Sequence, residues 1–192
     1  MPEYASFSDL IAATTPSWTL FLDRDGVLNT RRPDDYVKNW DEWEWVPGSP
    51  AAVSHLTGLF QYIIIVTNQQ GVGKGLMTEE DLIDIHTQME LGFRGVGAMV
   101  DAVYFCSDMA NDPENQRKPR PDMGLAAQAD FDGIDFATSI MVGDSDSDMA
   151  FGRNLGMVTV HIGPDPLTAA EHPDVDFAFA SLGAFAVAVT EL

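Results

Sequence analysis

The chain has 192 residues, of which 45% are hydrophobic and 10% aromatic, and its 30 acidic and 10 basic side chains give a formal net charge of −20. This length suits one folded domain, and the hydrophobic content excludes an intrinsically disordered chain. The negative charge disfavours nucleic acid and anionic membranes as partners, so any bound phosphate must be held by local cations.

Cys106 is the single cysteine, which excludes an internal disulfide and is typical of a reducing compartment. The first residues form neither a basic segment nor an apolar one, and no apolar run approaches the ~20 residues that cross a membrane. We therefore expect a cytoplasmic monomer without a membrane anchor.

Short apolar runs alternate with amphipathic stretches, which predicts an α/β fold with a central parallel sheet covered by helices. Residues 1–17 carry no motif and are interpreted as an N-terminal extension with a short helix near Ser8–Ala13, which leaves 18–192 as a single domain. In chain order the expected elements are a strand at Thr19–Leu22, a helix at Ser49–Phe60, a strand at Tyr62–Val66, a helix at Thr78–Leu91, a strand at Ala102–Phe105, a helix at Asp122–Ala129, a strand at Ser139–Val142, a helix at Ser147–Leu155, a strand at Val158–Ile162, an edge strand at Asp176–Phe179 and a helix at Leu182–Glu191.

Local signals support several of these helices. Thr78 and Asp81 have the spacing of a capping box, and Gly156 follows a helix as a C-cap residue would. Trp40, Trp43 and Trp45, together with Tyr36, could line a substrate pocket, but packing over the sheet is the more common fate of such aromatic side chains.

Polar residues follow three of the expected strands. They are Asp23–Gly26, Thr67–Gly71 and Gly143–Asp148. Because ligands bind at the carboxyl ends of the strands in open parallel sheets, these three segments are predicted to share one crevice.

The crevice has the residue types that phosphoryl transfer requires. Asp23 and Asp25 would repel each other unless a cation or a shared proton relieved the repulsion. Mg²⁺ does so and prefers a few carboxylate oxygens, which Asp23 and Asp144 can supply. Thr67 can donate to the transferring phosphoryl group and Lys118 can neutralise its charge. Asp25 can then protonate the leaving oxygen and deprotonate a water molecule.

Four segments carry a resemblance to a known family. Leu22–Asn29 resembles motif I of the haloacid-dehalogenase (HAD) superfamily, and Val66–Gly71 resembles motif II. Arg117–Pro121 resembles motif III, and Val142–Asp144 with Asp148 resembles motif IV. The resemblance implies a three-layer Rossmann-like fold of the capless HAD type, in which loops cover the site.

The resemblance also implies a role for each matching residue. Asp23 would be the nucleophile that forms an aspartyl-phosphate, and Asp148 would orient Lys118 or a metal-bound water. The implied catalytic residues are Asp23, Asp25, Thr67 and Lys118. The implied Mg²⁺ ligands are Asp23, Asp25 (through its backbone carbonyl) and Asp144. The implied substrate-binding residues are Arg31, Arg32, Asn68, Gln69, Arg117 and Lys118.

Within the superfamily, the motifs look most like the branch that holds D,D-heptose 1,7-bisphosphate phosphatases and histidinol-phosphatases. A small phosphorylated metabolite is the expected substrate, with heptose bisphosphate slightly ahead of histidinol phosphate. Polynucleotide 3′-phosphatase is an alternative that the net charge of −20 disfavours. A non-catalytic phosphate-binding module would require the loss of a catalytic residue, and none is missing.

One loop departs from the branch, whose members often carry a structural zinc before motif III. The corresponding positions here are Cys106, Asp108, Glu114 and Gln116. One thiolate with two carboxylates and an amide is a poor tetrahedral ligand set. We therefore predict no structural zinc, with the loop Ser107–Gln116 either held by hydrogen bonds and packing or partly mobile.

Overall fold

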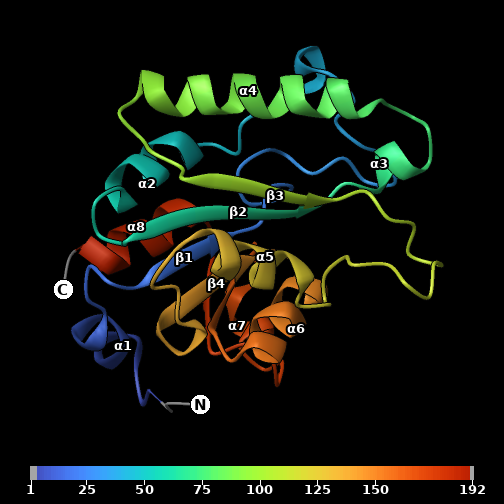
Figure 1. Cartoon of the computed structure of the whole chain (residues 1–192). Helices are drawn as coiled ribbons and strands as arrows, with labels where there is room; N and C mark the ends of the chain where they lie inside the picture. Colours follow the sequence, from blue (N-terminus) through green and yellow to red (C-terminus); the bar gives the residue numbers. More distant parts are fainter. Residues whose placement is uncertain (1–3, 191–192) are drawn as a thin grey trace.

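The computed structural model describes residues 4–190, and at its centre lies a six-stranded sheet (Figure 1). The strands are β1 (Thr19–Leu22), β2 (Tyr62–Asn68), β3 (Ala102–Cys106), β4 (Ser139–Gly143), β5 (Val158–Ile162) and β6 (Phe177–Phe179). Their order is β3-β2-β1-β4-β5-β6, and every neighbouring pair is parallel. The predicted α/β class with a central parallel sheet is confirmed.

Alternate side chains of the strands point to opposite faces of the sheet, and each face is covered by helices. Leu20 and Leu22 pack in the core beneath α2 (Ser49–Leu56), α4 (Glu79–Gly95) and α8 (Leu182–Thr190). Phe21 packs in the core on the other face, beneath α5 (Asp122–Asp130) and α6 (Asp146–Leu155). Figure 1 shows these helices on either side of the sheet, which gives three layers. The helices are α1 (Phe7–Ala13), α2 (Ser49–Leu56), α3 (Gln70–Gly73), α4 (Glu79–Gly95), α5 (Asp122–Asp130), α6 (Asp146–Leu155), α7 (Pro166–Ala169) and α8 (Leu182–Thr190), with 3-10 turns at Trp40–Glu42 and Phe136–Thr138.

The predicted N-terminal helix is present as α1, and it packs against the body of the protein. Leu10 is fully buried in the same core as Leu20. The ring of Phe7 lies edge-on to Phe177, Phe179 and Phe185, at centroid distances of 5.3, 4.9 and 6.0 Å.

Some element ends differ from the prediction. Strand β2 continues to Asn68 because Thr67 and Asn68 pair with β3. Helix α2 ends at Leu56 instead of Phe60, because Gly58 turns the chain at a φ of 83°. The short helices α3 and α7 were not predicted. Glu191, the expected last residue of the final helix, lies outside the described residues.

The predicted caps are confirmed. Thr78 and Asp81 form a complete capping box at the start of α4, and Gly156 ends α6 in the left-handed region with a φ of 81°. No helix in the described part of the chain is long and apolar enough to cross a membrane.

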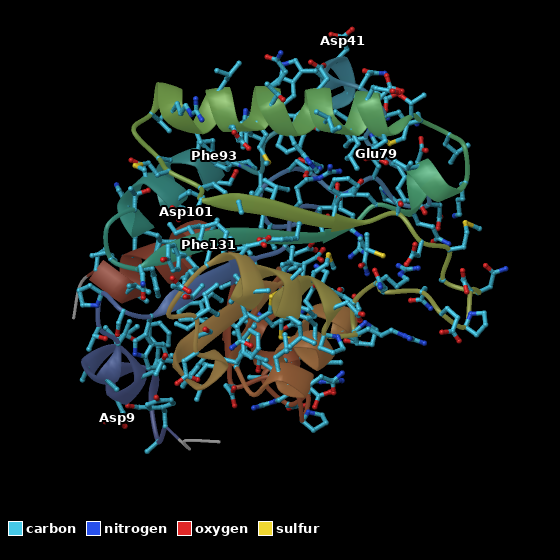
Figure 2. The ribbon with its side chains drawn as sticks, in the orientation of Figure 1. Asp9, Asp41, Glu79, Phe93, Asp101 and Phe131 are labelled. Atoms are coloured by element: carbon cyan, nitrogen blue, oxygen red, sulfur yellow. The ribbon has the colours of Figure 1, made fainter. Side chains whose placement is uncertain are left out.

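The tryptophan group packs over the sheet, as expected. The rings of Trp40 and Trp43 stack at 5.2 Å, and Trp45 lies edge-on to Phe93 at 5.1 Å. Phe93 reaches from α4 toward the sheet (Figure 2). These contacts fix the segment between β1 and α2 against α4.

Candidate active site

The three polar segments meet at the carboxyl edge of the sheet. β1 lies between β2 and β4 in register, with Leu22 opposite both Ile65 and Val142. The backbone N–H of Asp23 donates to the carbonyl of Val142 at 2.9 Å, so the ladder continues one residue past the strand. Gly26 then turns the chain at a φ of +94°, and a Cβ there would lie 1.9 Å from Asp144 Oδ2. Only glycine therefore lets this loop approach Asp144 so closely.

A buried charge chain forms the floor of the site. The ammonium of Lys118 donates to Asp23 Oδ1 at 2.8 Å and lies 2.6 Å from Asp148 Oδ1. It also donates to the carbonyl of Val66 at 2.7 Å. The ammonium thus makes two hydrogen bonds and one further ion pair, which together compensate for the near-complete burial of Lys118.

Burial and ion pairing shift the pKa values of Asp23 and Lys118. Burial, reinforced by the charge of Asp148, raises the pKa of Asp23 to about 7, although Lys118 opposes the shift. Burial alone would lower the pKa of Lys118, but Asp148 and Asp23 outweigh it and hold that pKa above its usual value. Lys118 is therefore a permanent cation in the site.

Asp25 is held in a separate network beside Asp23. Its carboxylate lies 3.0 Å from the guanidinium of Arg24 and accepts hydrogen bonds from Asn29 at 2.8 Å and Gln69 at 2.7 Å. Burial would raise the pKa of Asp25, but Arg24 and these hydrogen bonds outweigh it and keep the pKa below its usual value. In the ligand-free protein the low pKa keeps this side chain ionised, and the hydrogen bonds fix its orientation.

Arg24 was not expected to have a site role. It is fully buried, donates to Nε2 of His86 on α4 at 3.1 Å, and lies 5.7 Å from the centre of the Trp43 ring. Burial and the charge of Arg24 lower the pKa of His86 to about 3, so the imidazole stays neutral and can accept this hydrogen bond. In the sequence, the one sign of this role is the position of Arg24 between Asp23 and Asp25.

The carboxylates suitable for a metal are those of Asp23, Asp144 and Asp148, each of which offers an oxygen within 4.8 Å of the others. Asp148 is the most fully engaged: Oδ1 meets Lys118, and Oδ2 accepts from the hydroxyl and backbone N–H of Ser145 at 2.6 and 3.1 Å. Asp144 is bound to one guanidinium nitrogen of Arg31 at 3.0 Å. This hard-oxygen set fits Mg²⁺, with Asp23 and Asp144 as the available ligands and Asp148 as the support of Lys118.

The residues at the end of β2 lie in different places. The hydroxyl of Thr67 accepts from Gln69 at 2.8 Å and lines the pocket. Gln69 was expected to face the substrate, but its side chain is fully buried and supports Asp25 and Thr67 from behind. Asn68 exchanges two hydrogen bonds with the backbone of Lys118, at 2.9 and 3.1 Å, and so fixes the Lys118 loop against β2.

An open pocket of about 370 Å³ lies above these groups. Five of the chain's ten basic side chains line it: Arg31, Arg32, Lys74, Arg117 and Lys118. The predicted Arg31, Arg32 and Arg117 are thus brought together with Asp23. Tyr36, for which packing over the sheet was the favoured expectation, lines the pocket. Lys74 also lines it and was not predicted, because the adjacent helix α3 has no hydrophobic pattern.

The loop that departs from zinc-bearing relatives lies beyond β3. Asp108 Oδ2 accepts the backbone N–H of Gln116 at 2.7 Å, which closes the loop across its base. The N–H of Glu114 donates to Asp112 at 2.9 Å, and Cys106 is buried. The absence of structural zinc stays a prediction.

The HAD-hydrolase-like family model matches residues 115–180. D-glycero-alpha-D-manno-heptose-1,7-bisphosphate 7-phosphatase of Mycobacterium tuberculosis (strain CDC 1551 / Oshkosh) is 38% identical over 173 residues, which are 90% of this chain and 91% of the relative. D-glycero-beta-D-manno-heptose-1,7-bisphosphate 7-phosphatase of Vibrio cholerae is 35% identical over 147 residues, which are 73% of this chain and 77% of the relative.

A solved structure has the same fold over nearly all of its length. The crystal structure of D,D-heptose 1,7-bisphosphate phosphatase from B. bronchiseptica, complexed with magnesium and phosphate, is similar with a TM-score of 0.82 and 31% identity. The match covers 91% of this chain and 98% of that chain.

Proposed function

Since the chain belongs to the HAD superfamily of phosphatases, in the branch of the heptose bisphosphate phosphatases, we propose that it removes the 7-phosphate from D-glycero-α-D-manno-heptose 1,7-bisphosphate in a Mg²⁺-dependent reaction. The observation that carries the proposal is the 38% identity to the relative of that name over 91% of its length. The convergence of Asp23, Asp25, Thr67 and Lys118 on one pocket supports the same reaction.

In the first step, a carboxylate oxygen of Asp23 attacks phosphorus and the bond to the sugar oxygen breaks, which leaves an aspartyl-phosphate. Lys118 and Thr67 donate to the phosphoryl oxygens, where charge develops. Asp25 gives its proton to the leaving sugar oxygen. Because the pKa of Asp25 is held low, the negative charge of the bound phosphate must draw a proton onto it.

In the second step, Asp25 takes a proton from a water molecule that attacks phosphorus, and inorganic phosphate leaves with Asp23 regenerated. The ionised state of free Asp25 suits this role. Asp23 and Asp144, with the backbone carbonyl of Asp25, would hold Mg²⁺, which supplies positive charge against the phosphoryl oxygens. Asn29, Arg24 and Gln69 keep the carboxylate of Asp25 oriented in both steps.

The α-anomer is proposed because the M. tuberculosis relative named for it covers more of this chain than the V. cholerae relative named for the β-anomer. The test is a phosphate-release assay with both anomers, histidinol phosphate and a 3′-phosphorylated oligonucleotide, each at saturating Mg²⁺. We expect the highest kcat/KM with the α-anomer and the lowest with the oligonucleotide, because the net charge of −20 disfavours a polyanion.

Asp23→Asn is the control for contaminating phosphatases. An amide is a poor nucleophile, so kcat should fall ~10⁴-fold or more while the fold persists. Faster turnover of histidinol phosphate than of either heptose anomer would overturn the proposed substrate. Near-normal turnover by Asp23→Asn would overturn the mechanism.

A further inference from the structure

The outer wall of the pocket carries a lysine whose charge is not used by the protein. Lys74 is the C-cap residue of α3, and its ammonium lies 3.1 Å from the hydroxyl of Tyr36 and 5.2 Å from the centre of the Tyr36 ring. Both residues line the pocket that contains Asp23. Neither has a role in the steps described above.

Within residues 4–190, no carboxylate lies within 4.0 Å of the Lys74 ammonium. This matters because the chain has 30 acidic side chains for 10 basic ones, so pairing is the default fate of a cation. Other cations around the pocket follow that default: Arg31 pairs with Asp144 and Arg32 with Glu42. Lys74 is left with a neutral phenol and the face of an aromatic ring.

A second cation of the pocket, Arg117, lies beside the same helix, α3, and also has a neutral partner. Its guanidinium donates to Gln70 Oε1 at 3.2 Å, and Gln70 is the first residue of α3. In the described part of the chain it has no carboxylate within salt-bridge distance either. Two uncompensated cations therefore flank one short helix at the pocket wall, which makes a local anion site in a strongly acidic protein.

The Lys74 side chain is oriented by tight packing of Tyr36. A Cβ on Gly71 would lie 3.0 Å from Cγ of Tyr36, so the tyrosine rests directly on the backbone of α3. The ring holds the ammonium by a cation–π contact, and the hydroxyl fixes it by a hydrogen bond. Preorientation of this kind lowers the entropy lost when a ligand binds.

We propose that Lys74, positioned by Tyr36 and assisted by Arg117, binds the phosphate that the substrate retains. The proposal rests on the proposed function, because it requires a substrate with two phosphates. The transferred phosphate has its own donors in Thr67 and the buried Lys118. The exposed ammonium of Lys74 on the outer wall is then free for the second phosphate, and hydrogen bonds between an ammonium and a phosphate oxygen are among the strong, charge-assisted ones.

The test compares Lys74→Gln with the wild type on heptose 1,7-bisphosphate and on heptose 7-phosphate, which lacks the retained group. We expect kcat/KM for the bisphosphate to fall about tenfold, mainly through KM, and that for the monophosphate to change less than about twofold. The product, heptose 1-phosphate, should also inhibit the variant about tenfold more weakly. Lys74→Arg should restore most of the loss, and Tyr36→Phe should show a smaller loss in the same direction.

Arg94→Gln is the matched control, because it removes the same charge from an exposed position on α4 away from the pocket. This substitution should leave kcat/KM unchanged for both substrates. If the wild type favours the bisphosphate and Lys74→Gln retains that preference and the product affinity, the Lys74 subsite is wrong and the proposed function stands. If the wild type hydrolyses the bisphosphate no better than the monophosphate, the proposed function and the subsite both fail.

Discussion

The pocket has two regions that handle charge in opposite ways. The inner region, formed by Asp23, Lys118 and Asp148, is buried, and the Lys118 side chain is 1% exposed. The rim, formed by Arg31, Arg32, Lys74 and Arg117, is open, and the Arg31 side chain is 57% exposed. Charges in the inner region are partnered by other side chains, whereas two of the rim cations have neutral partners.

The inner region therefore carries the reaction, and the rim determines which substrate binds. A buried ion that loses its partner is left uncompensated, so the inner region tolerates little change. An exposed cation is screened by water and salt, so a rim residue can change without a large loss of stability. Relatives can therefore share the reaction and differ in the phosphate ester that they accept.

Substitution of Lys118 should show the largest effect. In Lys118→Met, Asp23 and Asp148 become neighbouring buried carboxylates without a cation, so the free energy of unfolding should fall by ~3–5 kcal/mol. kcat should fall ~10²–10³-fold, because a donor to the transferring phosphoryl group is lost. Chemical denaturation and steady-state kinetics measure the two effects.

Lys38→Met is the control, because Lys38 forms surface pairs with Asp35 and Glu42. It should leave kcat and the melting temperature close to those of the wild type. Equal losses of kcat and of stability in Lys118→Met and Lys38→Met would contradict the division of the pocket into two regions.

The pH dependence of Mg²⁺ binding sharpens the description of the inner region. Burial raises the pKa of Asp23 to about 7 in the metal-free protein, so below that pH a proton must leave before Asp23 can bind the metal. The apparent affinity for Mg²⁺ should therefore weaken by up to about tenfold per pH unit below pH 7 and level off above about pH 8. Calorimetric titration across this range measures it, and a flat profile would show that Asp23 is already ionised.

Ionic strength should produce the smallest effect, confined to the rim. Raising KCl from about 0.05 to about 0.5 M shortens the Debye length and should raise KM for the bisphosphate several-fold. kcat should change less than about twofold, because the buried pairs are shielded from salt. An equal change in both constants would mean that salt reaches the inner region.

Much of the fold was predictable, because its strands are short apolar runs that end at turn residues. The exceptions depend on partners far along the chain. Strand β2 gains Thr67 and Asn68 through pairing with β3, and no hydropathy pattern reveals that pairing. The four-residue helix α3 reads Gln-Gly-Val-Gly, a sequence with low helix propensity.

The site was predictable where residues follow strands and less so where they only support others. Asp23, Thr67 and Asp144 follow or end strands and meet as expected. The burial of Arg24 depends on His86, 62 residues away, and could not be read from a local pattern. Gln69 lies beside pocket residues in the sequence, but the turn after β2 sends its side chain inward.

The direct connection of β2 to α3 affects which substrates the protein selects. Thr67 is the second-last residue of β2, Lys74 is the C-cap residue of α3, and Tyr36 packs on Gly71 between them. With Lys74 as a receptor of the retained phosphate, one donor to each phosphate, Thr67 and Lys74, lies on one continuous segment that Tyr36 braces, so the separation of these two donors is fixed. This fixed separation then favours substrates whose two phosphates lie the same distance apart. The distance between the phosphates matters more for selection than the stereochemistry of the sugar that joins them.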